Sequence, residues 1–191
     1  YDTDDSLIPY KEIYNNLFAA VKKRVENTDR PVACLLSGGL DSSLIAALVK
    51  THYNGILETY SIGLPGSEDL KYAQLVADHI GSKHTSIEVS EEEFFDAIPD
   101  VIRDIESYDT TTVRASVGNW LIGKYISENS NAKVIFNGDG ADELMGGYLY
   151  FHKAPSSEEF QTECIRLIKD VQYFDVLRGD KTTAGNSLEI R

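Results

Sequence analysis

Two glycines, three serines and an aspartate lie together in one short segment of the chain. The segment consists of Ser37, Gly38, Gly39, Leu40, Asp41, Ser42 and Ser43. Glycine permits backbone angles that let successive N–H groups converge on an anion at a helix N-terminus, and the serine hydroxyls add donors. Because Asp41 would repel a phosphate directly, its presence indicates a Mg²⁺ ion between the two. The segment therefore predicts a phosphate and magnesium site, whereas an ordinary helix cap would explain Ser42 but not the whole pattern.

A second segment, residues 137–143, combines two glycines with three carboxylates. Its residues are Asn137, Gly138, Asp139, Gly140, Ala141, Asp142 and Glu143. An EF-hand calcium loop does not fit this spacing, because Ala141 occupies the fifth position, Asp142 replaces the glycine of the sixth and Tyr148 stands where a bidentate glutamate is required. A plain acidic turn is the remaining alternative to a ligand-binding loop.

Both segments follow short apolar runs, which are typical of strands buried on both faces. The predicted strands are residues 32–36, 59–62, 85–89 and 133–136. The predicted helices are residues 6–26, 42–50, 69–80, 91–105, 114–128 and 156–176. Alternating strands and helices predict an α/β fold with a mostly parallel sheet, in which ligands bind at the carboxyl ends of the strands. The two glycine-rich segments should therefore line one crevice.

Length, charge and cysteine content limit the functions that this chain can have. Its 191 residues fit one domain. A formal net charge of −13 argues against a nucleic-acid partner, and no apolar run approaches the roughly 18 residues that a membrane span needs. Cys34 and Cys164 lack the spacing of a zinc site or a disulfide framework, so we expect reduced thiols and a cytoplasmic protein.

Residues 118–124, with the sequence GNWLIGK, imitate the spacing of a Walker A phosphate loop. Tyr125 stands where a Ser or Thr should bind Mg²⁺, and the segment is predicted to be helix interior rather than a strand-to-helix turn. We therefore expect no second phosphate site in this helix.

With further blocks of sequence, the two glycine-rich segments resemble the PP-loop enzymes, or N-type ATP pyrophosphatases, which split ATP between its α and β phosphates. Within that group the chain is similar to the synthetase domain of the glutamine-dependent asparagine synthetase family over residues 10–191. The supporting blocks are residues 37–43, 61–67, 69–71, 108–116, 138–144 and 146–155. The resemblance implies an open, mostly parallel, doubly wound sheet followed by C-terminal helices, in one domain over residues 1–191.

The resemblance also implies how the two segments bind ATP and Mg²⁺. The implied nucleotide contacts are Leu36, Ser37, Gly38, Gly39, Asp41, Ser42, Ser43, Ile62, Asn137 and Gly138. Asp41 and Asp142 would hold Mg²⁺ on the pyrophosphate. Leu36 and Ile62 would frame the adenine, although apolar residues at strand ends belong to the core in any globular protein.

Further residues are implied in the handling of aspartate and of the acyl-adenylate. Asp139 matches a position that the closest members of the family fill with glutamate, so a carboxylate is kept but its reach is shorter, and catalytic geometry is sensitive to such displacements. Arg114, with Thr111 and Thr112, would orient aspartate and stabilise charge at phosphorus. An alternative is that these residues form the solvated start of a helix.

By this resemblance the protein is expected to be a carbon–nitrogen ligase that uses ATP and Mg²⁺ to convert aspartate to asparagine. A β-aspartyl-AMP intermediate would form, and AMP and pyrophosphate would be released. Ammonia would come from glutamine through a glutaminase domain of the parent protein in cis, and a homodimer of that protein is compatible with the resemblance. Two alternatives stay open: a PP-loop ligase that adenylates another carboxylate, similar to a β-lactam synthetase, and a truncated, non-catalytic ATP-binding module.

The chain is expected to be incomplete at its C-terminal end relative to this family. The N-terminal glutaminase domain is absent, and Arg191 falls before a Val-Pro-Phe-Leu-Asp-like segment and a lysine that meets the transferring phosphoryl group. We therefore expect the isolated fragment to bind Mg-ATP weakly and to turn over little or not at all.

Overall fold

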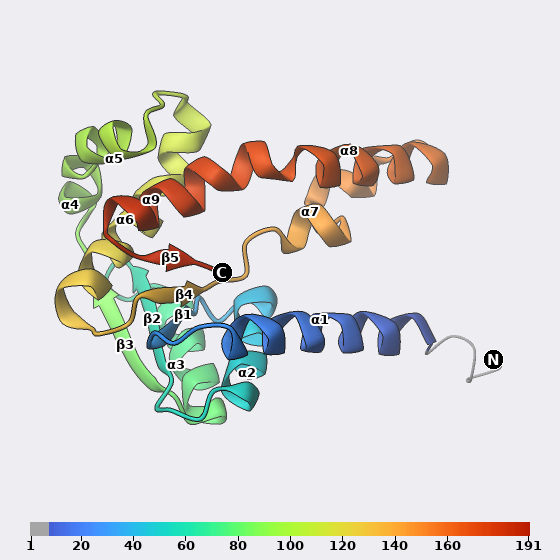
Figure 1. The fold of residues 1–191 in the computed structure, drawn as a ribbon. Coiled ribbons are helices and arrows are strands. Elements are labelled where there is room, and N and C mark those ends of the chain that lie inside the picture. Colours follow the sequence, from blue (N-terminus) through green and yellow to red (C-terminus); the bar gives the residue numbers. More distant parts are fainter. Residues whose placement is uncertain (1–7) are drawn as a thin grey trace.

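The computed structural model describes residues 8–191, apart from the side chains of residues 8 and 174–177. Helices and strands alternate along most of the chain (Figure 1). The strands are β1 (Val32–Leu35), β2 (Glu58–Gly63), β3 (Lys83–Glu88), β4 (Val134–Phe136) and β5 (Glu189–Ile190). The helices are α1 (Ile8–Glu26), α2 (Leu40–His52), α3 (Glu68–Ile80), α4 (Glu91–Asp96), α5 (Ile98–Ile105), α6 (Thr110–Asn129), α7 (Ala141–Met145), the 3₁₀-helix η2 (Leu149–Lys153), α8 (Ser157–Asp175), the π-helix η3 (Val176–Lys181) and α9 (Thr182–Gly185).

The five strands of the described chain form one parallel sheet in the order β3-β2-β1-β4-β5. The chain first builds outward from β1 to β3 and then crosses back to place β4 on the other side of β1. Cys34 of β1 consequently pairs with Thr59 of β2 and with Phe136 of β4. The predicted α/β fold with a parallel, doubly wound sheet is confirmed, and the reversal between β1 and β4 is where such sheets bind ligands.

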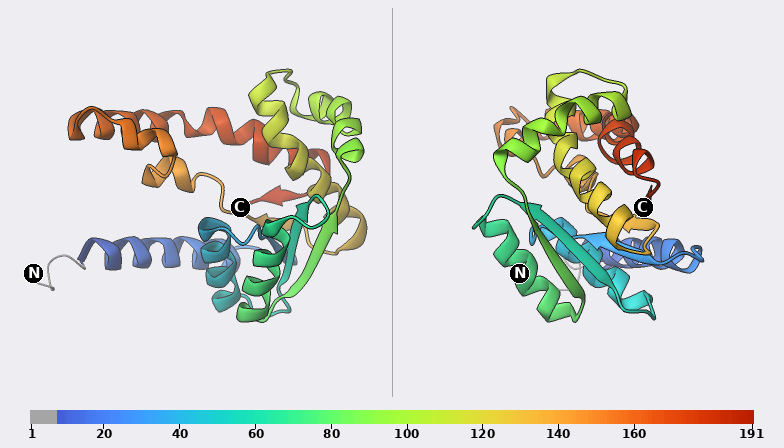
Figure 2. Two further views of the ribbon diagram at one scale, coloured as in Figure 1. Left: turned by 180° about the vertical axis from the view of Figure 1, so that it is seen from behind. Right: turned by 90° about the vertical axis from the view of Figure 1, so that its left-hand side faces the viewer.

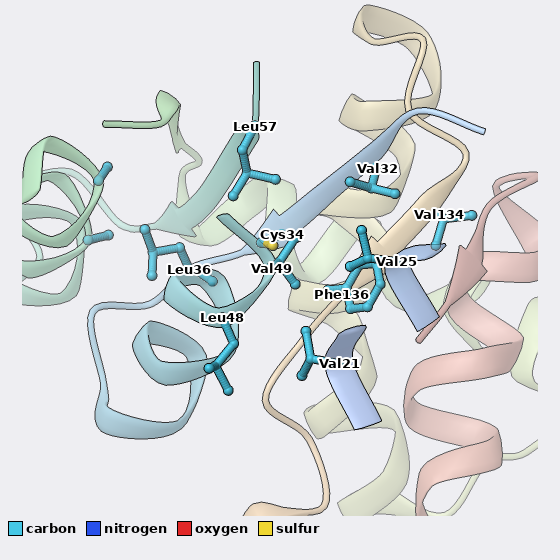
Figure 3. Packing of buried hydrophobic residues seen from close by; sticks show 13 residues of the cluster. Val21, Val25, Val32, Cys34, Leu36, Leu48, Val49, Leu57, Val134 and Phe136 are labelled. Atoms are coloured by element: carbon cyan, nitrogen blue, oxygen red, sulfur yellow. The ribbon is translucent and has the colours of Figure 1, made fainter. Parts of the chain in front are cut away.

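Helices cover both faces of the sheet, which explains the continuous apolar runs of its central strands. α1, α2 and α3 lie on one face, and α6 lies on the other (Figure 2). Val32 and Cys34 of β1 belong to the core on the first face, together with Val25 of α1 (Figure 3). Ala33, between them in sequence, belongs to the opposite core with Ile126 of α6. Side chains that alternate along β1 thus supply both cores.

The structure differs from the sequence prediction in several local features. α6 begins at Thr110, earlier than predicted, because the Asp109 carboxylate caps it by accepting a hydrogen bond of 2.9 Å from the Thr112 N–H. The helix predicted over residues 91–105 is split into α4 and α5, and Pro99 lies in the first turn of α5, where proline is tolerated. β5 was not predicted.

The predictions for residues 118–124 and for the packing of the two cysteines are confirmed. Residues 118–124, which imitate a Walker A loop, lie in the interior of α6. Cys34 and Cys164 are buried free thiols, and burial raises the pKa of the Cys34 thiol, which keeps it in its unreactive protonated form. Within residues 8–191, no helix combines the length and the apolar character that crossing a bilayer requires.

A polar network joins β2 and β3. The His84 ring lies between hydroxyls of the neighbouring strand, with Nδ1 2.9 Å from Thr59 Oγ1 and Nε2 3.0 Å from Ser61 Oγ. Thr59 and Ser61 are both buried. Burial lowers the pKa of His84, and the negative charge of Asp78 opposes this shift only in part. The folded protein therefore favours the neutral imidazole.

This network makes the stability of the fold depend on pH. Because the pKa of His84 is lower in the folded state, the unfolded chain binds more protons between the two pKa values. The free energy of unfolding should therefore fall as the pH drops below about 6.5, the ordinary value for histidine. His84→Gln, whose amide can bond both hydroxyls without titrating, should show a smaller loss in urea unfolding curves recorded at about pH 7.5 and about pH 5.5. Equal losses in the two proteins would exclude His84 as the cause.

Candidate active site between β1 and β4

The first glycine-rich segment connects β1 to α2 and lies directly against α3. Gly38 has a φ of +82°, in the left-handed region that favours glycine. A Cβ at this position would lie 2.6 Å from backbone atoms of both Tyr72 and Ala73. The backbone angle and the close approach to α3 therefore both require glycine, and the contact fixes where the segment crosses the end of β1.

Serine hydroxyls hold the same segment in a compact turn. Ser37 Oγ and Ser42 Oγ lie 3.0 Å apart. Ser43 Oγ donates a hydrogen bond of 2.6 Å to the Gly39 carbonyl. Gly39 is the N-cap residue of α2 and provides no side-chain cap for the N–H groups of the first turn. The positive end of the α2 dipole is thus available to an external anion.

The second glycine-rich segment follows β4 and touches the first. A Cβ at Gly138 would lie 2.8 Å from the Ser42 backbone nitrogen and 2.9 Å from the Asp41 carbonyl carbon. The two loops are therefore in backbone contact at the N-terminus of α2. Gly140, with a φ of +88°, then turns the chain into α7, whose first turn contains Asp142. Asp41 occupies the equivalent position in the first turn of α2.

A cavity of about 380 Å³ lies between the two loops. Residues of both loops, of α6 and of η3 line it. Four carboxylates face this space, and they belong to Asp41, Asp139, Asp142 and Glu143. Arg178 is the single basic side chain among the described residues that line it. A polyphosphate can bind in such acidic surroundings only where a cation and backbone N–H groups offset the repulsion.

Burial and mutual repulsion act on these carboxylates. Burial raises the pKa of Asp142, and the charges of Asp41 and Glu143 raise it further. Burial also raises the pKa of Asp139, although Asn137 Nδ2 donates a hydrogen bond of 2.6 Å to this carboxylate and stabilises its ionised form. Asp139 retains contact with water in the crevice while protein surrounds it on its other sides. Both groups therefore bind protons more readily than a free aspartate does.

Asp41 and Asp142 suit a magnesium ion that substrate phosphates also hold. No group of three or more His, Cys, Asp and Glu side chains in the described part of the chain is arranged as a metal site. Mg²⁺ commonly takes only one or two protein carboxylates and completes its shell with water and phosphate oxygens. An ion between Asp41 and Asp142 would also relieve the repulsion that raises the pKa of Asp142. The donors present therefore fit magnesium bound together with a nucleotide.

Most residues that the sequence assigned to the two loops line this cavity. They are Ser37, Gly39, Asp41, Ser42, Asn137, Gly138, Asp139 and Asp142. Gly38 and Ser43 lie outside its walls, where they fix the loop against α3 and against the Gly39 carbonyl. Leu36 is only 1% exposed and belongs to the first core, whereas Ile62 is half-buried against the opposite core. The contact of Leu36 and Ile62 with adenine stays a prediction.

The residues predicted to orient aspartate are not among those that line this cavity. Arg114 is exposed and borders a separate, largely apolar groove with Phe95 and Tyr108. Thr111 and Thr112 belong to the first turn of α6 and are not part of the cavity lining between the loops. Binding of aspartate by these residues stays a prediction.

Residues outside the two glycine-rich segments complete the cavity and were not predicted. Ala115 and Asn119 are four positions apart on α6, so helical spacing places them on one face, and this signal was present in the sequence. Tyr148 donates a hydrogen bond from its hydroxyl to the buried Glu143 carboxylate. Arg178 carried no local signal, because it reaches the cavity only through the packing of η3 on α6.

Comparison with known proteins shows which family has this arrangement of loops. The sequence profile described as asparagine synthase matches residues 12–162, a range that contains both loops. The chain belongs to the asparagine synthase family. A glutamine-hydrolyzing asparagine synthetase of Homo sapiens is 50% identical over 203 residues, which cover 100% of this chain and 36% of the human protein. The Bos taurus enzyme of the same name is 51% identical over 90% of this chain and 31% of its own length.

This family member therefore spans about a third of the length of the curated relatives that it matches. Among solved structures, an NH3-dependent NAD synthetase from Campylobacter jejuni is similar, with a TM-score of 0.50 and 18% sequence identity. The match covers 88% of this chain and 76% of the synthetase. At this identity the likeness concerns the fold alone, and it agrees with the doubly wound sheet described above.

A comparison of two glycine variants tests the contact between the first loop and α3. Gly38 and Gly66 have φ angles of +82° and +78°, which cost an alanine about 1–2 kcal/mol in either position. A Cβ at Gly66 meets nothing within 4 Å, whereas one at Gly38 meets the α3 backbone. Gly38→Ala should therefore reduce the free energy of unfolding by at least about 2 kcal/mol more than Gly66→Ala in urea denaturation. Equal losses would show that the loop does not depend on this contact.

Proposed function

We propose that the full-length protein converts aspartate to asparagine, with cleavage of ATP to AMP and pyrophosphate and with ammonia as the nitrogen source. The backbone contact between the two glycine-rich loops carries this proposal, because it joins an uncapped helix N-terminus and two first-turn aspartates in one cavity. Family membership, and about 50% identity to glutamine-hydrolyzing asparagine synthetases, support the choice of substrates.

In this proposal the pyrophosphate end of ATP lies at the start of α2. Backbone N–H groups of residues 40–42, in the first turn of α2, and the hydroxyls of Ser37 and Ser42 donate to its oxygens. Asp41 and Asp142 would hold Mg²⁺, which would offset the negative charge of the phosphates. The acidic lining of the cavity is the reason to expect that ATP binds there together with such an ion.

The chemistry begins with a carboxylate, which is a poor electrophile until it carries a leaving group. A side-chain oxygen of aspartate attacks the α-phosphorus of ATP, and the bond from that phosphorus to pyrophosphate breaks. Ammonia then attacks the acyl carbon and loses a proton, and the bond to AMP breaks. The guanidinium of Arg178 is suited to stabilise charge on the α-phosphoryl oxygens. Asp139, whose pKa is raised, is suited to accept the proton from the attacking nitrogen.

The proposal extends to the source of ammonia and to the compartment in which the protein works. We propose that ammonia comes from glutamine in a glutaminase domain in cis, because the relatives are named as glutamine-hydrolyzing and this chain matches only 36% of the human one. The buried free thiols of Cys34 and Cys164 fit a reducing compartment such as the cytoplasm. A homodimer stays a prediction.

The substitution Asp142→Asn should have different effects on the stability of the protein and on its use of Mg²⁺. Because folding raises the pKa of Asp142, its ionised form is disfavoured in the folded state at every pH above about 3.9, the ordinary value for aspartate. Asparagine removes this unfavourable charge, so the free energy of unfolding without Mg²⁺ and nucleotide should stay equal or rise. Pyrophosphate release should nevertheless fall about tenfold or more and require higher Mg²⁺ concentrations. Asp170→Asn, at a partly exposed ion pair with Arg166 outside the cavity, is the control. A destabilised Asp142→Asn protein with normal activity would contradict the assignment.

Release of pyrophosphate that depends on aspartate tests the function itself. The full-length protein, supplied with ATP, Mg²⁺, aspartate and ammonia, should form pyrophosphate and asparagine in equal amounts. Arg178→Ala should lower kcat about a hundredfold, because a donor to the transition-state charge is lost. No release by the wild-type protein would refute asparagine formation. Release with a different carboxylate would instead identify another PP-loop ligase, and nucleotide binding without release would identify a non-catalytic module.

A further inference from the structure

Arg178 reaches the cavity from η3, which is a π-helical turn. Such turns are rare and occur mostly at functional sites, since the wider turn disturbs the regular pairing of backbone groups. In this turn, side-chain hydroxyls satisfy the carbonyl groups. Thr182 Oγ1 donates to the Arg178 carbonyl at 2.9 Å and to the Gly179 carbonyl at 2.8 Å. The position of the turn thus depends on a few identifiable side chains.

A second donor to the Arg178 carbonyl comes from α6. Asn119 Nδ2 donates to it at 3.2 Å, across 59 positions of sequence. The next residue, Trp120, accepts a hydrogen bond of 3.2 Å at its carbonyl from Asn186 Nδ2. Trp120 is itself anchored, because its Nε1 donates to Asp104 at 2.6 Å. Two adjacent residues of a well-packed helix therefore hold both ends of the segment from η3 to α9.

We propose that Asn119 is a positioning residue that holds the Arg178 guanidinium in the cavity by fixing the backbone of η3. The inference rests on the proposed function, in which Arg178 faces the reacting phosphoryl group. Arginine has a long side chain with several rotatable bonds, so the point from which it extends decides where its charge can reach. A displacement of about 1 Å at a catalytic group is enough to cost a large part of the rate.

The Asn119 amide also lines the cavity, so direct contact with a substrate is the competing explanation. The two explanations differ in how the effects of Asn119 and Arg178 combine. If Asn119 acts through Arg178, its removal has no further effect once the guanidinium is gone. If it binds a substrate by itself, the two losses multiply.

A double-mutant cycle on pyrophosphate release by the full-length protein distinguishes the explanations. Asn119→Leu preserves size and removes the donor, and it should lower kcat about tenfold or more with a smaller change in the KM for ATP. Combined with Arg178→Ala, it should be no slower than Arg178→Ala alone. Thr182→Val removes the other donor to the same carbonyl, so it should behave in the same way and replaces Asn119→Leu if that variant does not fold. Asn129→Leu is the matched control, since its amide donates to the Tyr125 carbonyl at 2.9 Å on the same helix, and it should keep wild-type activity.

Multiplicative losses, or an unchanged kcat in Asn119→Leu, would overturn the positioning role and leave the proposed function intact. An absence of aspartate-dependent pyrophosphate release in the wild-type protein would refute the proposed function itself. The two failures are therefore distinguishable within one set of measurements.

Discussion

The approach of the Gly138 backbone to the first turn of α2 is the contact on which the site depends. A side chain at this position would meet the Ser42 nitrogen at 2.8 Å and the Asp41 carbonyl carbon at 2.9 Å. β1 and β4 are neighbours in the sheet, with Cys34 opposite Phe136, so their loops leave the same edge side by side. Glycine lets the loops close on one another, and the cavity, the adjacent carboxylates and the open end of α2 all follow from that closure.

Closure also concentrates negative charge. Asp41 and Glu143 raise the pKa of Asp142, and Arg178 is the single basic side chain in the described lining of the cavity. The folded site is therefore electrostatically unfavourable on its own and becomes favourable with a divalent cation and a phosphate ligand. Functional sites commonly lower the stability of the folded protein in this way. Arg178 adds a positive charge to the lining near Asp139 of the second loop, at a position that the contacts of η3 with α6 determine.

The sequence was informative where structure is local. The apolar run of residues 32–36, followed at once by glycine and serine, predicted a buried strand and an anion-binding turn, and the rule for parallel sheets placed the two loops together. The predicted start of α6 was wrong, because the Asp109 cap rather than the apolar pattern determines where this helix begins. β5 is defined only by its pairing with β4, since two residues carry no periodic pattern. The position of Arg178 depends on a π-helical turn and on the hydrogen bond from Asn119. Neither feature can be predicted from the residues next to Arg178 in the sequence.

The most direct test of the two-loop site is a crystal structure of the full-length protein with Mg²⁺, aspartate and an ATP analogue. A methylene group between the α and β phosphates of the analogue would prevent cleavage. We predict β and γ phosphates against the backbone N–H groups of residues 40–42, Mg²⁺ between Asp41 and Asp142, and the α-phosphate toward Arg178. Phosphates that contact only one loop, or a nucleotide in the apolar groove beside Arg114, would contradict the account.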